Sequence, residues 1–439
     1  MSRILEKILT VIFALTTVFG CIEELDIETL GETEEEGLLV VEAVLTNEIK
    51  TQQVLLSRSE TRLNLETDEE YNPNVPTGGG VLESVQMESG ATVRLFGSNG
   101  TTFDFVEGQP GNYSSTVPFA LETGVDYELE ITTLSGKEYS SDPLRVQGTA
   151  EITNVYAEKA ISDSGAEGVA IYVDSEPRTG TAQYYKYTYE ETYKIVPPYL
   201  SNFEFKLTNY DPCALPFPTY DLQVIPKENP VDACYNTEIS NTILQESTVG
   251  NPNANITKKM VRFIGRDNYI MSHRYSILVK QQVQSAEAYN YFEALKNFSE
   301  SGDLFSQIQP GALYANLRRK DGASENVLGY IDVVGVTEKR FFFNFEDFYP
   351  GEELPPYPFD CTLQTAPESH PSYCDPMPGS NPCPLSIIER VDQGLISYYD
   401  AYSEGVLPTA SCPGPYIFVS SACGDCALGS KTKPDFWID

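Results

Sequence analysis

Alternation of apolar and polar residues with a period of two is the feature that most limits the fold of this chain. Runs rich in β-branched and aromatic residues begin at Leu38. Within them, Val93 and Leu95, then Phe103 and Phe105, alternate as residues on a half-buried strand face do. Turn signals divide the runs at 98–100, 109–112 and 134–136. Short strands separated by such turns predict a β-sandwich rather than a helical domain.

The predicted fold class is mainly β, in two domains. We expect residues 38–148 to form an immunoglobulin-like or transthyretin-like β-sandwich, and residues 149–349 to form a second, β-rich α+β domain. Two domains also suit the length, because a chain of 439 residues exceeds what one core usually serves. Residues 350–439 are rich in Pro and Cys and bury little by themselves. We expect disulfides to hold them onto the second domain.

A long alternating strand in the second domain places three tyrosines on one face. The run QYYKYTYEETYKIV, residues 183–196, carries Tyr185, Tyr187 and Tyr189 at every second position. Such a row can serve as an aromatic platform for a sugar or peptide ligand. Packing on a core is the simpler interpretation, since strands favour tyrosine and its hydroxyl can reach the rim of a core.

One clear helix is predicted in the second domain. Ser285 is a candidate N-cap, and Glu287 lies in the first turn. The sequence Ser-Gly at 301–302 would end the helix. The predicted buried stripe consists of Ala288, Tyr289, Phe292, Leu295 and Phe298. The run VLGYIDVVGVTEKRFFFNF that follows, residues 327–345, is predicted to be a pair of strands.

The number of cysteines indicates an oxidising compartment. Nine occur, and setting Cys21 aside leaves eight, an even number that allows up to four disulfides. The eight are Cys213, Cys234, Cys361, Cys374, Cys383, Cys412, Cys423 and Cys426. Cys213 and Cys234 share a long Pro- and Asn-rich insertion, residues 197–257, and we expect them to pair with each other. The other six stay unassigned.

The sequence CGDC at 423–426 has three interpretations. Structural disulfides suit an exported protein. A zinc site would use Cys423 and Cys426 with Cys412 and His370. A redox dithiol would need Cys423 at a helix N-terminus after a strand, but the flanks are rich in Gly and Pro. We expect disulfides here, with no metal and no cofactor.

Residues 1–20 are predicted to be a secretory signal peptide. Arg3 and Lys7 form a basic start, and residues 8–19 are an apolar run too short to span a bilayer. A small residue then precedes Cys21, as in the lipobox of bacterial lipoproteins. Lipidation needs a thiolate nucleophile, and stable anchoring needs more than one acyl chain. We expect lipidation of Cys21; the alternative is ordinary cleavage, with Cys21 in a disulfide.

Acidic residues follow Cys21 directly. Glu23, Glu24 and Asp26 resemble the export signal that carries Bacteroidetes lipoproteins to the outer face of the outer membrane. Residues 21–37 hold many carboxylates and few bulky apolar residues, so we expect an acidic, disordered tether. The expected location is the bacterial outer membrane, with the lipid-anchored chain facing the cell exterior.

Net charge excludes some partners. The full chain carries a formal charge of −35. Without residues 1–20, 27 basic and 63 acidic residues remain, a net charge of −36. Such a chain repels polyanions, so we expect no nucleic-acid partner.

No catalytic motif is visible in the sequence. His273 lies beside a predicted strand and suits a structural role, and His370 lies in a Pro-rich loop. We find no nucleophile elbow, zinc-protease helix, phosphate-binding glycine loop or EF-hand loop. Carboxylate pairs are too frequent here to be informative, although a glycosidase pair can be hidden among them. We therefore expect that the protein is not an enzyme.

Several segments together resemble one family. They are LLVVEAVLT at 38–46, SGATVRLFG at 89–97, FSESGDLFSQIQPGALYANLRR at 298–319, ENVLGYIDVVGVTEKRFF at 325–342 and CGDCALGSKTKPDFW at 423–437. With the lipobox, this order is similar to a family of Bacteroidetes lipoproteins catalogued as domain of unknown function 4249. Ser430 departs from the family pattern, in which a second Gly is common.

The resemblance implies a surface lipoprotein without an established activity. Members of the family are often encoded beside a TonB-dependent outer-membrane receptor. We therefore expect a binding or accessory subunit of a TonB-dependent β-barrel transporter, held in the bilayer by acylated Cys21. The alternatives are a surface hydrolase acting on glycans and an adhesion or interaction module.

Overall fold

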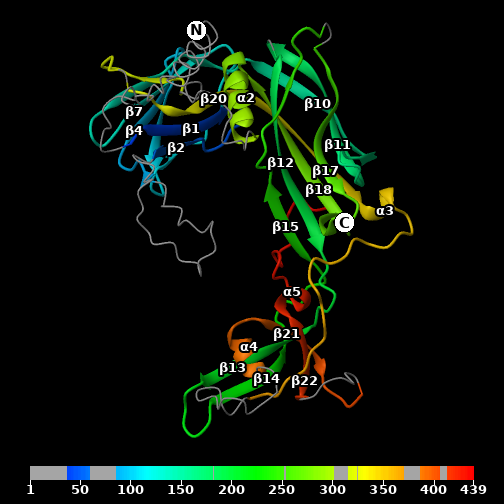
Figure 1. Cartoon of the computed structure of the whole chain (residues 1–439). Coiled ribbons are helices and arrows are strands. Elements are labelled where there is room, and N and C mark those ends of the chain that lie inside the picture. The colour runs from blue at the N-terminus through cyan, green and yellow to red at the C-terminus, as the bar shows by residue number, and fades with distance from the viewer. Residues whose placement is uncertain are drawn as a thin grey trace, which may run out of the picture.

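Strands dominate the structure, which is a computed structural model. It describes residues 37–59, 86–180, 182–251, 254–300, 315–323, 325–369, 386–405 and 413–439. The predicted mainly β fold is confirmed. Figure 1 shows a large upper part, which we call the body, and a smaller lower part, which we call the distal lobe. The distal lobe comprises the described residues of 203–226 and 363–420.

One sheet of 15 strands runs through the whole body. Near its middle, β1 (Leu39–Thr46) pairs antiparallel with β2 (Gln53–Arg58) and parallel with β20 (Leu328–Asn344). The sandwich-like side adds β3 (Gln86–Met87), β4 (Thr92–Gly97), β5 (Thr102–Glu107), β6 (Asn112–Ser115), β7 (Asp126–Thr132), β8 (Glu138–Ser141), β9 (Leu144–Arg145) and β19 (Leu317–Arg319). The other side adds β12 (Tyr184–Ile195), β15 (Cys234–Ile239), β16 (Leu244–Ser247) and β18 (Arg274–Gln284). The β1–β20 pair thus joins the two predicted domains, whose boundaries remain predictions.

β20 is a single strand of 17 residues, so the predicted strand pair at 327–345 is wrong. Its first half pairs with β1 and its second half with β18. Gly335, at the change of partner, is no turn residue. A Cβ atom at Gly335 would lie 2.0 Å from the backbone oxygen of Gly148. The missing side chain therefore lets β20 pass close to a neighbouring strand without interruption.

A second sheet covers one face of the main sheet. It consists of β10 (Gly148–Ile161), β11 (Glu167–Gly180) and β17 (Ile256–Gly265). Tyr185 and Tyr187 are fully buried in the core that includes these strands, and Tyr189 is 7% exposed. Packing of the tyrosine row on a core, the simpler interpretation, is therefore confirmed, and the alternative of an aromatic ligand platform is wrong. Alternate residues of β12 face the second sheet, and packing against it leaves no room for a ligand.

Helix α2 (Ala286–Glu300) confirms the predicted helix. Its N-cap is as expected, since Ser285 Oγ accepts a hydrogen bond of 3.1 Å from the N–H of Ala288. The predicted stripe is less buried than expected: Ala288 is buried, whereas Tyr289, Phe292 and Leu295 are half-buried. The shorter helical elements are η2 (Tyr269–Met271), α3 (Phe345–Phe348), α4 (Ile387–Asp392) and α5 (Ser421–Gly424). Within the described ranges, no helix has the length and apolar character to cross a bilayer.

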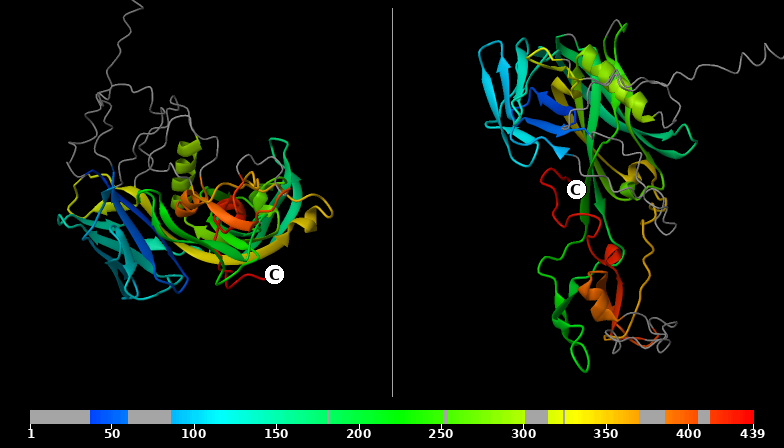
Figure 2. Two further views of the ribbon diagram at one scale, coloured as in Figure 1. Left: turned by 90° about the horizontal axis from the view of Figure 1, so that it is seen from below. Right: turned by 60° about the vertical axis from the view of Figure 1, so that its left-hand side comes forward.

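The distal lobe is built from two segments that are far apart in the sequence (Figures 1 and 2). Its strands are β13 (Phe203–Asp211), β14 (Thr219–Pro226), β21 (Ile396–Ala401) and β22 (Tyr416–Ser420). Ile387 and Phe418, from the tail, are buried there against Phe205 and Leu222, from the insertion. Each segment therefore covers apolar residues of the other, which neither could bury alone.

A buried ion pair ties the two sheets of the body together. Arg262 on β17 donates two hydrogen bonds of 3.0 Å to the carboxylate of Glu191 on β12. Tyr275 on β18 donates a third, of 2.6 Å, to the same carboxylate. The Glu191 side chain is 5% exposed, so these three donors replace the water that burial removes.

We expect Glu191→Gln to lower the free energy of unfolding by about 2–3 kcal/mol, because Arg262 would lose its charge partner. The Arg262 side chain is 28% exposed, so water moderates the cost. Urea denaturation measures the change. Asp104→Asn is the control, since it breaks the exposed pair with Arg94 and should cost less than about 0.5 kcal/mol. Equal losses in the two variants would contradict this account.

Candidate binding site in the distal lobe and its neck

Four stretches of chain connect the body to the distal lobe. They are residues 196–202, 227–234, 356–362 and 421–431, and we call them the neck (Figures 1 and 2). The last stretch, which contains α5, contacts the others. The N–H of Tyr199 donates to the carbonyl of Cys423 at 3.0 Å, and the Tyr357 hydroxyl donates to the carbonyl of Ala422 at 2.6 Å.

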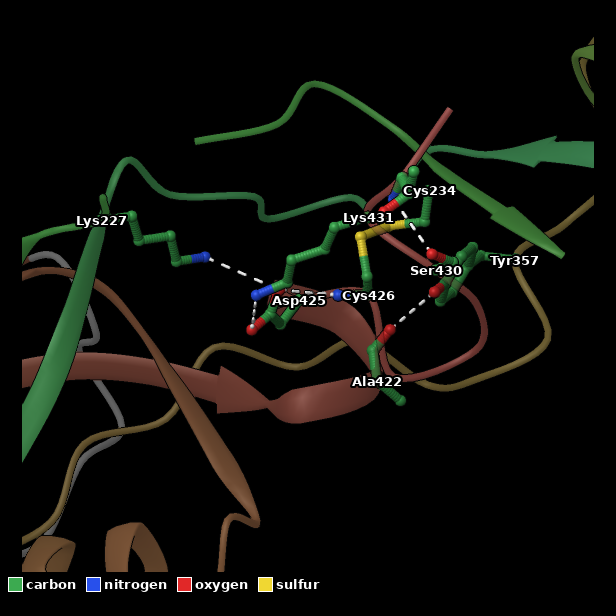
Figure 3. The surroundings of a disulfide bond; sticks show 9 residues. Lys227, Cys234, Tyr357, Ala422, Asp425, Cys426, Ser430 and Lys431 are labelled. Carbon is green, nitrogen blue, oxygen red and sulfur yellow. Dashed lines mark hydrogen bonds and ion pairs between the residues drawn. A yellow bond between two sulfur atoms is a disulfide. The ribbon is translucent and has the colours of Figure 1, made fainter. Parts of the chain in front are cut away.

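Two disulfides lock the neck. Cys234 is bonded to Cys426, 192 residues away, and Cys361 is bonded to Cys423 (Figure 3 shows the first). The predicted Cys213–Cys234 pair is therefore wrong. Cys213 lies beyond the end of β13, whose nine residues span roughly 30 Å, whereas Cys234 lies in the neck. Cys213 therefore lies at the turn of the β13–β14 hairpin, and Cys234 lies beyond its other end, although the two cysteines are close in sequence.

The structure also decides between the interpretations of CGDC. Cys423 and Cys426 form disulfides with two different stretches of the neck, so the structural interpretation is confirmed, and the redox dithiol and the zinc site are wrong. Among the described residues, no group of three or more His, Cys, Asp or Glu could hold a metal ion. A Cβ atom at Gly424 would lie 2.6 Å from Ser397 Cβ, so the glycine of the motif allows α5 to approach β21 closely.

A cavity of about 330 Å³ lies beside α5, between the neck and the distal lobe; we call it the neck pocket. Its aromatic wall is Phe203, Phe205 and Tyr398, with centroids of Phe205 and Tyr398 5.4 Å apart in edge-on contact. Its polar lining includes Glu204, Lys227, Ser397, Ser421, Asp425 and Lys431. Its size is near the lower end of the range of small-molecule sites, roughly 300–1,000 Å³.

Asp425 is the centre of charge in the neck pocket (Figure 3). Lys431 Nζ lies 2.9 Å from Asp425 Oδ1 and 3.0 Å from Oδ2, and the N–H of Cys426 donates to Oδ1 at 2.8 Å. Burial alone would raise the pKa of Asp425, but these hydrogen bonds and the charge of Lys227 hold it below its usual value. The carboxyl is therefore ionised near neutral pH and suits binding better than proton donation.

The tip of the distal lobe, residues 212–218, exposes large apolar side chains. Leu215 is 94% exposed and Phe217 is 60% exposed. The tip connects β13 to β14 and contains three prolines, which restrict the backbone. At its base, the N–H of Cys213 donates to Asp211 Oδ1 at 3.0 Å. Exposed apolar residues held in this way are typical of contact surfaces.

A buried polar cluster beneath α2 was missed by the sequence analysis. Asp332 on β20, 2% exposed, accepts a hydrogen bond of 2.6 Å from Gln284 Nε2 on β18. Lys186 on β12 lies with Nζ 3.7 Å from the ring centroid of Phe292. Burial raises the pKa of Asp332 and lowers that of Lys186, and each charge partly opposes the shift of the other. The sequence signal of this cluster was a charged residue among the apolar and aromatic residues of each strand, Lys186 in β12 and Asp332 in β20.

His273 lines two adjoining grooves of the body, of about 160 and 410 Å³. Burial, and then the charge of Lys194, lower the pKa of His273, so the imidazole is neutral at pH 7. Its backbone oxygen accepts a hydrogen bond from the N–H of Phe345. The structural role expected for His273 stays a prediction.

Several predicted site residues lie outside the described residues. They are Cys21, Glu23, Glu24, Asp26, His370, Cys374, Cys383 and Cys412. The signal peptide, the lipidation site and the export signal therefore stay predictions.

Fold and site define a mainly β protein in which a disulfide-locked neck holds a small lobe away from a large body. The family described as Domain of unknown function (DUF4249) has a sequence model that matches residues 22–340, and the chain belongs to this family. No curated protein and no solved structure matches the chain. The match ends within β20, so the resemblance of segment 423–437 to the family stays a prediction.

Digestion without reductant by a protease that cleaves before Asp425, between Cys423 and Cys426, is expected to give one peptide pair that joins Cys234 to Cys426 and another that joins Cys361 to Cys423, as mass spectrometry can show. A pair joining Cys213 to Cys234 would contradict the structure.

The double variant Cys234→Ser/Cys426→Ser is expected to lose about 2–4 kcal/mol of stability, because its unfolded chain gains conformational freedom.

The variant Asp332→Asn tests the buried polar cluster. Because the pKa of Asp332 is raised in the folded state, its stabilising contribution is fully present below its unfolded pKa of 3.8 and is lost as pH rises through the folded value. We therefore expect the free energy of unfolding of Asp332→Asn, relative to the wild type, to be higher at pH 7 than at pH 3.5. Urea denaturation at both pH values measures it. An unchanged difference would show that Asp332 titrates alike in both states.

Proposed function

We propose that this chain is a lipid-anchored protein of the outer-membrane surface that binds a partner through its distal lobe. The partner would be a TonB-dependent β-barrel transporter, and this chain its accessory subunit. Support for the location comes from Cys21 after a short apolar run and from Glu23, Glu24 and Asp26 behind it. Family membership supports the same class, through the lipoprotein character that the resemblance implies.

The exposed tip of the distal lobe is the observation that carries the proposal. Leu215 and Phe217 leave most of their apolar surface in water, which is unfavourable in the free protein. Burying them against a partner would recover that free energy. The neck disulfides would limit movement of the lobe, so binding would cost less conformational entropy.

A non-enzymatic role agrees with the chemistry of the neck pocket. A glycosidase needs one carboxylic acid that is protonated at working pH. In the neck pocket, the pKa of Asp425 is shifted in the opposite direction, downward. The strongly negative net charge further disfavours nucleic acid as a partner.

Co-isolation tests the proposal. From native outer membranes in mild detergent, the tagged wild type is expected to bring down a TonB-dependent barrel, identified by mass spectrometry. The double variant Leu215→Ser/Phe217→Ser should recover at least about tenfold less barrel, because two apolar anchors of the interface are lost.

The control is Leu134→Ser/Ile161→Ser, which changes two body residues that are 78% and 71% exposed. Its recovery of the barrel should equal that of the wild type. A second variant, Cys21→Ala, should appear in the soluble fraction. Equal recovery by the tip variant, or a wild type that isolates without any barrel, would refute the proposed docking.

A further inference from the structure

The neck pocket contains a lysine whose charge is only partly satisfied. The Lys227 side chain is 9% exposed, and its Nζ lies 3.8 Å from Asp425 Oδ1. That distance is an ion pair but is too long for a hydrogen bond. Within the described part of the chain, the ammonium of Lys227 has no closer polar partner. Its hydrogen-bonding capacity, three donors, is therefore available to a molecule in the pocket.

A hydroxyl group suits the space between Lys227 and Asp425. Its oxygen can accept a hydrogen bond from the ammonium while its proton is donated to the carboxylate. An oxygen about 2.8 Å from both atoms satisfies both bonds, since the two atoms are 3.8 Å apart. A water molecule can make the same bonds, and a ligand hydroxyl would replace it without loss.

The other charges of the pocket disfavour ionic ligands. Lys227 and Lys431 balance Glu204 and Asp425, so the lining has no net charge. A ligand carboxylate or phosphate would approach the carboxylates of Glu204 and Asp425, and a ligand ammonium would approach the two lysines. The net charge of the whole chain, −35, also repels anions at long range.

The aromatic wall supplies an apolar surface beside these polar groups. Phe203 is 46% exposed and lies with its ring centroid 6.4 Å from that of Tyr398. The wall and the charged residues line the same cavity. A ligand that fits must therefore combine an apolar face with hydroxyl groups around its edge, and a pyranose ring has this form.

We propose that the neck pocket binds a neutral saccharide, with one hydroxyl held between Lys227 and Asp425 and a sugar face against Phe203 and Tyr398. The pocket has room for a sugar unit of a longer chain. This inference goes beyond the proposed function, because it uses the neck and requires no partner at the tip.

Calorimetry with the full-length chain in mild detergent tests it. The probes are neutral tetrasaccharides of glucose, xylose, mannose and galactose, an anionic uronic-acid tetrasaccharide and a cationic glucosamine tetrasaccharide. At least one neutral probe should bind, and more tightly than either charged probe. Lys227→Met should weaken this binding by at least about tenfold, the loss expected for a hydrogen bond to a charged group. Tyr398→Ala should weaken it too.

Lys206→Met is the matched control, because Lys206 is an exposed lysine on β13 outside the pocket lining. It should bind the probe like the wild type. A measurement without any variant is lysine acetylation read by mass spectrometry: the bound probe should protect Lys431, which lines the pocket with 47% of its side chain exposed, and leave Lys206 reactive.

The proposal is overturned if no neutral probe binds, if a charged probe binds more tightly, or if Lys431 gains no protection. Leu215→Ser/Phe217→Ser is expected to bind saccharide like the wild type. Failure of saccharide binding would therefore leave docking at the tip intact, and failure of docking would leave saccharide binding intact.

Discussion

Parallel pairing of β1 with β20 is the contact on which the body depends. It joins residues 40–46 to residues 328–334, so that the first described strand and the last strand of the body lie side by side. Through it, the sandwich-like half and the second half share one sheet. β20 then continues alongside β18, where the Glu191–Arg262 pair links that half to the second sheet. Without this long-range pair, the two halves would each present an unpaired sheet edge.

The disulfides of the neck stabilise the small distal lobe. Among the described residues, the core of the distal lobe is small, and both the insertion and the tail contribute side chains to it. Cys423, in α5, and Cys426, just after it, form disulfides with two other stretches of the neck. Gly424 permits the close contact between α5 and β21. Cross-links thus replace part of the hydrophobic core that the lobe lacks. The same arrangement forms the neck pocket and carries the exposed tip.

Local patterns were predictable because their causes are local. The period of two along β4 and β5 and the Ser285 cap of α2 depend on neighbours within a few residues. The sequence predicted that Tyr185, Tyr187 and Tyr189 share one face of a strand. That this face is buried depended on the second sheet, which packs against it. The cysteine pairs and the Lys186–Asp332 cluster depend on strands distant in sequence, and no local signal specifies them.

The sequence by itself determined that the described part of the chain is mainly β with one substantial helix, and that the two cysteines of CGDC serve as cross-links. Those properties follow from side-chain periodicity, capping and composition, which act over short distances. Only the tertiary structure decided that the insertion and the tail form one lobe, and that Cys234 meets Cys426 instead of Cys213. The physical reason is that the β13–β14 hairpin separates near neighbours in sequence, while the shared lobe core brings remote segments together.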